Sequence, residues 1–272
     1  MNALKPMIKR TISLMASDFK VQQSGLAFFY RAYEESVFAG LIARGHRTVL
    51  SGPFKGMKVQ ETESGKNFRT THLLGTFETC LNQPIMNLAA KTKRLINIGC
   101  GSGYYTNGLA FHYKDSRPDM SVSGYDIDKS QIERANGLAR YNGLTNVMHH
   151  AITPDFDYRA VCEQGGLAII DIEGAEYDLL TGQKQAFLNC DMLIEIHSHN
   201  NIDFDGGIKI LSDLYKDTHT ASVIEETKSV PFDLYPLLAP SLGHLGYLGM
   251  HLLVCENRKV PMKWLVLEKR AA

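Results

Sequence analysis

One stretch of the chain, Arg94–Ala110, limits its fold more than any other. It reads RLINIGCGSGYYTNGLA: apolar residues typical of a buried parallel strand lead into Gly99, Gly101 and Gly103, and a helical spacing follows. Glycine tolerates positive φ and has no Cβ, so such a turn lets the backbone come close to a ligand. The helix that follows directs its first N–H groups towards negative charge. The stretch therefore predicts a strand, a turn and a helix that bind a nucleotide-type cofactor.

The spacing of these glycines indicates which cofactor. The dinucleotide fingerprint is G-x-G-x-x-G, whose third glycine allows close packing around a pyrophosphate. Here the order is G-x-G-x-G, and Tyr104 stands where that third glycine belongs. The spacing disfavours a pyrophosphate and favours S-adenosylmethionine, which has no phosphate. The alternative is a glycine-rich turn in another kind of α/β protein, because a glycine motif indicates a cofactor only together with its structural context.

From residue 94 onward, expected strands and helices alternate. This alternation predicts an α/β fold with a doubly wound, mainly parallel sheet. The expected strands are Leu95–Gly99, Ser121–Asp126, Val147–Ala151, Leu167–Ile172, Met192–His197, Ala221–Thr227 and about Trp264–Glu268. The expected helices are Thr76–Ala90, Tyr105–Tyr113, Lys129–Asn142, Ala175–Gly182 and Gly206–Tyr215.

We expect an extension before the cofactor-binding domain and an insertion within it. Residues 1–75 form the extension, with one or two amphipathic helices over Asp18–Arg44 and a short hairpin over Arg47–Gln60. Residues 76–272 form the domain. Within it, Ser229–Met250 holds three prolines and three glycines without steady periodicity, which predicts a long irregular insertion. A lid, a packed surface excursion and a dimer contact are the alternatives for this segment.

Charge and cysteine content bear on partners and location. Lys plus Arg (29) balance Asp plus Glu (29), so no overall field draws the chain to nucleic acid or to an anionic membrane. We expect a small or neutral acceptor. No run approaches the ~20 apolar residues of a membrane helix. The five cysteines are scattered without metal-ligand spacing, which predicts reduced thiols in a cytoplasmic protein. The sequence does not determine the oligomeric state, and a homo-oligomer is one alternative.

Two strand ends carry residues suited to an adenosine. Asp126 ends the second expected strand, and ligands of open α/β sheets lie outside the carboxyl ends of strands. Its carboxylate can accept hydrogen bonds from both ribose hydroxyls. Asp128 is expected to cap the next helix. The third strand ends at Ala151 and Ile152, where adenine would lie.

The fourth and fifth strands end in acidic residues and a histidine. Asp171 lies at the tip of the fourth strand and is followed by Glu173 and by Glu176, which we expect on a solvated helix face. His197 ends the fifth strand and is the candidate base, since imidazole accepts a proton near neutral pH. Asp171 and Glu173 are the other candidate catalytic residues. A histidine bonded to backbone is the alternative. His199 is expected to be a loop residue.

A site without metal is the leading expectation for this end of the sheet. In a variant, Asp171, Glu195 and His197 hold a divalent ion that acidifies the acceptor hydroxyl. Glu195 counts against the variant, because neighbouring strand residues alternate in face.

Several motifs, in this order and spacing, resemble the FkbM-type family of S-adenosylmethionine-dependent methyltransferases. They are LLGTFET, NIGCGSGYYTNGLA, YDID, ARYNGLTNV, IIDIEGAEYDLL and MLIEIHSH, and they cover about Phe54–His199. The resemblance implies a Rossmann-like class I methyltransferase fold and O-methylation of sugars or secondary metabolites. It also implies these site residues: Gly99, Cys100 and Gly101 at the methionine end, Asp126 at the ribose, Ile127 and Ile152 at the adenine, Asp171 on the acceptor side, and Glu78 closing the pocket.

One departure from the family pattern keeps a second function open. Where the family commonly has an acid in the first strand, this chain has Asn97, which forms hydrogen bonds but carries no charge. A methyltransferase-like binding or regulatory subunit without catalysis is therefore an alternative. A further alternative, an NAD-dependent enzyme, is supported only by the Rossmann-like turn.

Overall fold

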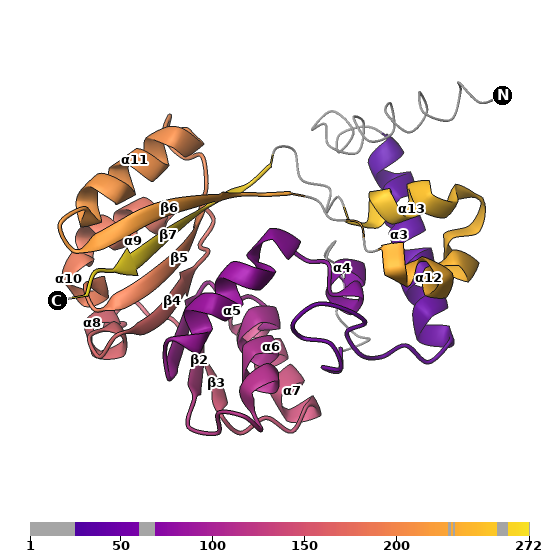
Figure 1. Ribbon diagram of the computed structural model, residues 1–272, viewed down its shortest axis with the longest axis horizontal. Coiled ribbons are helices and arrows are strands. Elements are labelled where there is room, and N and C mark those ends of the chain that lie inside the picture. The colour runs from indigo at the N-terminus through magenta and orange to yellow at the C-terminus, as the bar shows by residue number, and fades with distance from the viewer. Residues whose placement is uncertain (1–24, 60–68, 228–229, 231, 255–260, 272) are drawn as a thin grey trace. The chain divides into compact units, whose positions relative to one another are not determined.

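The computed structural model describes residues 25–59, 69–227, 230, 232–254 and 261–271 (Figure 1). They form two compact units, one from Met1–Thr79 with Thr227–Pro261 and the other from Cys80–Glu226 with Met262–Ala272. The boundary expected from the sequence, between residues 75 and 76, lies close to the division after Thr79. The segment Thr227–Pro261, however, belongs to the first unit and not to the unit that contains the sheet.

The second unit is built on one seven-stranded sheet with the strand order β3-β2-β1-β4-β5-β7-β6. Strands β1 to β5 run parallel, β7 is antiparallel to β5, and β6 is antiparallel to β7. This is the strand order of the class I methyltransferase fold, so the predicted fold class is confirmed. The strands are β1 Arg94–Ile98, β2 Ser121–Asp126, β3 Val147–Ala151, β4 Gly166–Ile170, β5 Cys190–Ile196, β6 His219–Glu225 and β7 Lys263–Lys269.

Apolar strand residues bind this sheet to its helices. On one face, side chains from β1, β4 and β5 pack with those of α9, α10 and α11 in one core cluster. Helix α6 contacts β1, β2 and β3 and α7 contacts β2 and β3, so helices cover this part of the sheet as well (Figure 1). The helices are α5 Asn82–Ala90, α6 Tyr104–Tyr113, α7 Lys129–Tyr141, α8 Tyr158–Cys162, α9 Glu176–Gly182, α10 Lys184–Phe187 and α11 Phe204–Tyr215.

Local sequence signals explain where these elements begin. Asp128 caps α7, because its side chain accepts a hydrogen bond from the Ser130 N–H at 2.8 Å, as predicted. The predicted helix over Thr76–Ala90 is wrong in its first part. A 3₁₀ turn at Thr79–Leu81 precedes α5, and Glu78 has a φ of 45°, which no α-helix contains.

The first unit contains α3 Gly25–Ala43, α4 Arg69–Leu74, α12 Tyr235–Leu242 and α13 Gly246–Val254. The N-terminal part of the expected helix and Gln60 of the expected hairpin lie outside the described residues. Of that hairpin, the structure has a single antiparallel bridge between Thr48 and Lys58. Helix α3 approaches α13 so closely that a Cβ at Gly249 would lie 2.0 Å from the Tyr33 hydroxyl oxygen.

The expected irregular insertion is instead largely helical. Some of its prolines and glycines lie at the starts and ends of short helices, whereas Pro240 and Gly249 lie inside them. Pro236 lies in the first turn of α12, where proline needs no N–H partner. Gly243 and Gly246, with φ of 56° and 48°, separate α12 from α13. The interrupted periodicity thus reflects breaks between helices, not a loop.

Among the described residues, one stretch, Phe232–Val254, is helical, long and apolar enough to cross a membrane by length and composition. Its mean hydropathy is 1.3, and 33% of its most apolar window is buried in the structure. The sequence analysis expected no such stretch. A single stretch of this kind is weak evidence of a membrane span.

A buried histidine joins β3 to two helices in the second unit. His149 Nε2 lies 2.7 Å from Thr106 Oγ1 on α6, and Nδ1 lies 3.2 Å from Asn136 Oδ1 on α7. Burial and the neighbouring His150 lower the pKa of His149 from 6.5 to about 4. The fold therefore holds this ring in its neutral form.

This neutral histidine predicts a loss of stability in acid. The unfolded chain takes up a proton at His149 as the pH falls through 6.5, whereas the folded chain resists until about pH 4. The stabilisation is complete above pH 6.5 and is lost between pH 6.5 and 4, by up to ~3 kcal/mol at 1.36 kcal/mol per pKa unit. Urea unfolding across this range should give a shallower pH dependence for His149→Gln than for the parent. His112→Gln, at an exposed position, should match the parent, and equal slopes for all three proteins would contradict the prediction.

Candidate functional site

The three glycines after β1 serve different purposes. A Cβ at Gly99 would lie 1.7 Å from the Asp171 carbonyl oxygen, and one at Gly103 would lie 2.8 Å from the Ala135 Cβ. These two glycines are required by packing within the protein. Gly101 also has a positive φ, 52°, but a Cβ there would meet nothing within 4 Å. The open face of the turn is thus at Gly101, where a ligand can come close.

The backbone of this turn is held by the neighbouring strand. The N–H groups of Gly99 and Cys100 both donate to the Tyr125 carbonyl oxygen, at 2.8 and 3.0 Å. A cofactor can therefore contact these two residues only through their other atoms. Burial and the charge of Asp126 raise the pKa of the Cys100 thiol, so this sulfur is a neutral packing group.

Asp126 lies beside the glycine turn, at the end of β2. Its Oδ2 accepts a hydrogen bond from the Gly101 N–H at 2.9 Å, and its Oδ1 accepts one from the Asp128 N–H at 2.8 Å. A carboxylate has about four acceptor positions, so each oxygen can accept a second hydrogen bond. The fixed orientation suits two adjacent hydroxyls. Asp126 thus lies where the sequence predicted a ribose contact.

The other predicted cofactor contacts differ in how well they are placed. Ile127 is an apolar side chain that is 80% exposed next to Asp126, as an adenine-covering residue would be, and Ile152 is half-buried against the core. Asn97 is buried in β1, and its amide donates to the Ile169 carbonyl oxygen at 3.2 Å. An amide at position 97 can thus donate to the neighbouring strand, which an ionised carboxylate cannot do. Glu78 is buried in the first unit, and its role in the pocket stays a prediction.

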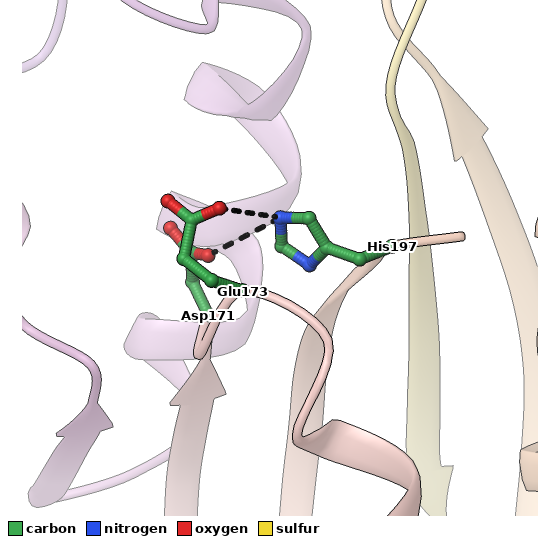
Figure 2. Close-up of side chains that lie close together, drawn as sticks. All are labelled: Asp171, Glu173 and His197. Atoms are coloured by element: carbon green, nitrogen blue, oxygen red, sulfur yellow. Dashed lines mark ion pairs between the residues drawn. The ribbon is translucent and has the colours of Figure 1, made fainter. Parts of the chain in front are cut away.

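The acceptor-side candidates come together at the ends of β4 and β5 (Figure 2). His197 Nε2 lies 3.9 Å from Asp171 Oδ1 and 3.6 Å from Glu173 Oε2. Asp171 and His197 are partly buried, whereas the Glu173 side chain is 90% exposed. Figure 2 shows both carboxylates turned towards the same side of the imidazole ring. All three predicted catalytic residues thus belong to one cluster.

Glu176 corrects the sequence analysis, which expected it on a solvated helix face. Its side chain is 0% exposed, and its Oε1 lies 2.9 Å from His197 Nδ1. The same oxygen accepts hydrogen bonds from the N–H groups of Ile172 and Gly174, at 3.0 and 3.2 Å. The carboxylate closes the loop between β4 and α9. The signal in the sequence was the spacing D-x-E-G-A-E, in which a glycine turn folds the third acid back onto its own loop.

This hydrogen bond governs the charge of the imidazole. Burial lowers the pKa of His197, but the Glu176 hydrogen bond and the charges of Glu195, Glu176 and Glu173 outweigh burial and leave the pKa raised. For Glu176, burial raises the pKa. The hydrogen bonds from His197 and from the backbone outweigh burial and leave the pKa of Glu176 below its ordinary value. Tyr177 holds His197 through its backbone, since the Tyr177 hydroxyl donates to the His197 carbonyl oxygen at 2.6 Å.

The cluster also changes the metal variant considered from the sequence. Within the described residues, Asp171, Glu173 and His197 have ligand atoms that all lie within 4.8 Å of one another. Glu195 is not part of this set. It lies buried in β5 two residues before His197, which is about 6.6 Å along a strand.

A comparison with protein families agrees with the cofactor-side geometry. Residues 89–152 match the family model described as "Methyltransferase domain". The chain contains an S-adenosylmethionine-dependent methyltransferase domain. The matched residues run from the end of α5 to the end of β3 and include the glycine turn and Asp126.

Solved structures similar to this chain include two methyltransferases and one protein in complex with AdoMet. The geranyl diphosphate C-methyltransferase from Streptomyces coelicolor A3(2) is 13% identical, with a TM-score of 0.46 over 88% of this chain and 98% of its own. Coclaurine N-methyltransferase is 14% identical (TM-score 0.42; 97% and 94%), and M. jannaschii TYW2 is 13% identical (TM-score 0.42; 66% and 69%). Comparison with curated proteins finds no match. At these values, the three structures carry no information on the acceptor.

The residues of the methyltransferase domain suit S-adenosylmethionine. The open face at Gly101 leaves room for a ligand, and Asp126 offers two oriented oxygens beside it. The exposed Ile127 offers apolar surface for a base. These features lie at the carboxyl ends of β1 and β2, where ligands of such sheets bind.

The different surroundings of the glycines give a paired prediction. Gly99→Ala should lower the free energy of unfolding by about 3 kcal/mol or more, because its Cβ would overlap the Asp171 carbonyl oxygen at a positive φ. Gly101→Ala should cost only about 1–2 kcal/mol for its φ, yet weaken binding of S-adenosylhomocysteine more than about tenfold, since the Cβ occupies the open face. Denaturant unfolding and titration calorimetry measure the two effects. Normal cofactor binding by Gly101→Ala would show that the turn is not the site.

Proposed function

We propose that this chain is an O-methyltransferase of the FkbM type that acts on a hydroxyl of a small molecule, such as a sugar or a secondary metabolite. The observation that carries the proposal is the contact between the loops after β1 and β4. Gly99 in the first loop lies against the Asp171 backbone in the second, which supports one site shared by the glycine turn and the cluster of Asp171, Glu173 and His197. The order and spacing of the motifs support the FkbM type. The balanced charge supports a small acceptor, and the scattered cysteines support a cytoplasmic location.

On the cofactor side, each residue has a distinct task. Asp126 accepts the ribose hydroxyls, while Ile127 and Ile152 cover the adenine. Gly101 leaves room for the methionine end, which Gly99 and Cys100 border. When bound, S-adenosylmethionine supplies an electrophilic methyl group on a sulfonium, which departs as a neutral thioether.

On the acceptor side, the chain must align a hydroxyl with that methyl group and remove its proton. Alignment alone contributes much of such a rate, because the reaction becomes effectively unimolecular. His197 Nε2 is the proposed proton acceptor, and Asp171 and Glu173 hold the hydroxyl beside it. Glu176 holds the imidazole from behind, and Tyr177 holds the backbone carbonyl of His197.

The test of the cofactor is a pair of thermal melts. S-adenosylhomocysteine at 100 times its dissociation constant should stabilise the fold by about 2.7 kcal/mol, and NAD should not shift the melt. Stabilisation by NAD alone would contradict the proposal.

Asp126→Ala tests the ribose assignment. Loss of hydrogen bonds to a charged group should cost about 1.5–3 kcal/mol of binding, which is a rise of about 10- to 150-fold in the dissociation constant of S-adenosylhomocysteine. Asp128→Ala is the matched control in the same loop. It loses the cap of α7, and with it some stability, but should bind the ligand normally. Equal affinities of both variants in titration calorimetry would refute the assignment.

His197→Gln tests the acceptor side. The variant should bind S-adenosylhomocysteine normally and lower the single-turnover rate of labelled methyl transfer by ~10²–10⁴-fold, using the first acceptor found in a panel of sugars and phenols. His199→Gln, an exposed histidine two residues on, should keep the parent rate. If His197→Gln turns over normally, deprotonation does not depend on His197.

A further inference from the structure

The cluster of Asp171, Glu173 and His197 combines two carboxylates with an imidazole. Such a mixed set of oxygen and nitrogen ligands suits divalent first-row transition metals, whereas Mg²⁺ and Ca²⁺ prefer oxygen alone. We propose that these three side chains bind one divalent cation of this class. The inference goes beyond the O-methyltransferase proposal and depends on it only for the chemical use of the ion.

The distances in the cluster match a metal site that closes slightly around its ion. With metal–ligand bonds of about 2.1 Å, neighbouring ligand atoms of an octahedral ion lie about 3.0 Å apart and opposite ones about 4.2 Å. His197 Nε2 lies 3.6 Å from Glu173 Oε2 and 3.9 Å from Asp171 Oδ1, and all three ligand atoms lie within 4.8 Å of one another. Side-chain movements of about 1 Å would bring the three ligand atoms to these distances, and the exposed Glu173 side chain has room to move.

The buried carboxylate behind the imidazole is an independent reason to assign a metal. A metal-binding histidine almost always donates its other ring N–H to a carboxylate or a carbonyl, which fixes the tautomer. Glu176 accepts from His197 Nδ1 at 2.9 Å and is itself held by two backbone N–H groups. With the proton on Nδ1, the lone pair of Nε2 points at the two remaining carboxylates (Figure 2). Three carboxylates thus surround one imidazole, but Glu176 alone lies behind it.

The position of the cluster gives the ion a use. It lies at the carboxyl ends of β4 and β5, on the acceptor side of the proposed active site. An acceptor hydroxyl bound to the cation would have a lowered pKa and release its proton to solvent at neutral pH. His197 then acts as a ligand in place of acting as the base, and the oxygen is left as the nucleophile for the methyl group.

Binding of Mn²⁺ to the full chain tests the inference without any acceptor. Loss of the free Mn²⁺ signal in electron paramagnetic resonance should give one site per chain. Asp171→Asn and His197→Gln should each weaken Mn²⁺ binding at least tenfold. Glu176→Gln, which touches no ion, should weaken it by about 10- to 100-fold, because the imidazole loses its orientation. Asp178→Asn, an exposed acid on the same helix, should bind Mn²⁺ as the parent does.

S-adenosylhomocysteine binding, measured on each of these proteins, keeps this inference separate from the proposed function. Normal S-adenosylhomocysteine binding without Mn²⁺ binding would overturn the metal site and leave the methyltransferase intact. Mn²⁺ binding that all four variants retain would place the ion elsewhere and also overturn the site. Full methyl transfer by chelator-treated protein would overturn the catalytic use of the ion. Mn²⁺ binding that falls in Asp171→Asn, His197→Gln and Glu176→Gln but not in Asp178→Asn would support the site even if S-adenosylhomocysteine did not bind.

Discussion

The close approach of the loop after β1 to the loop after β4 is the constraint on which the site depends. No side chain fits between Gly99 and the Asp171 carbonyl oxygen, so the two loops lie in direct contact. In this sheet order, β1 and β4 are the neighbours at which the chain direction around the sheet reverses. The glycine turn therefore brings two halves of a site together, one beside Asp126 and the other beside His197. Any atom added at Gly99 separates them.

A second constraint is the burial of Glu176. A carboxylate without partners would be costly inside the protein, but here one oxygen accepts from two backbone N–H groups and lies 2.9 Å from His197 Nδ1. The loop and the imidazole are thereby fixed by the same atom. Backbone strain accompanies this arrangement, because Glu173 adopts a left-handed φ of 54° that non-glycine residues rarely take. The loop thus gains its contacts to Glu176 Oε1 at the expense of one unfavourable backbone conformation, at Glu173, whose side chain is 90% exposed.

Periodicity and strand ends made much of the fold predictable from the sequence. Buried strands such as β1 and the cap at Asp128 follow from local patterns, and the positions of Asp126 and His197 follow from the rule that ligands bind at strand ends. Glu176 was misjudged because helical position alone does not show that a glycine turn folds the first residue of α9 inward. The membership of Thr227–Pro261 in the first unit could not be predicted either, since packing between segments far apart in the chain leaves no local pattern.

The charges of the acceptor side connect the two proposals. Asp171 and Glu173 would lie near a sulfonium, and carboxylates favour that cation over a transition state in which its charge is being lost. Left uncompensated, they would tighten cofactor binding and slow methyl transfer. A positive partner on His197 Nε2, either a proton or a divalent cation, offsets this field, and Glu176 holds the ring so that Nε2 faces both carboxylates. If His197 is the base, the proton that it takes from the hydroxyl supplies this charge, and if His197 is a ligand, the cation supplies it. On either route, the two carboxylates require one positive charge at Nε2 as the methyl group is transferred.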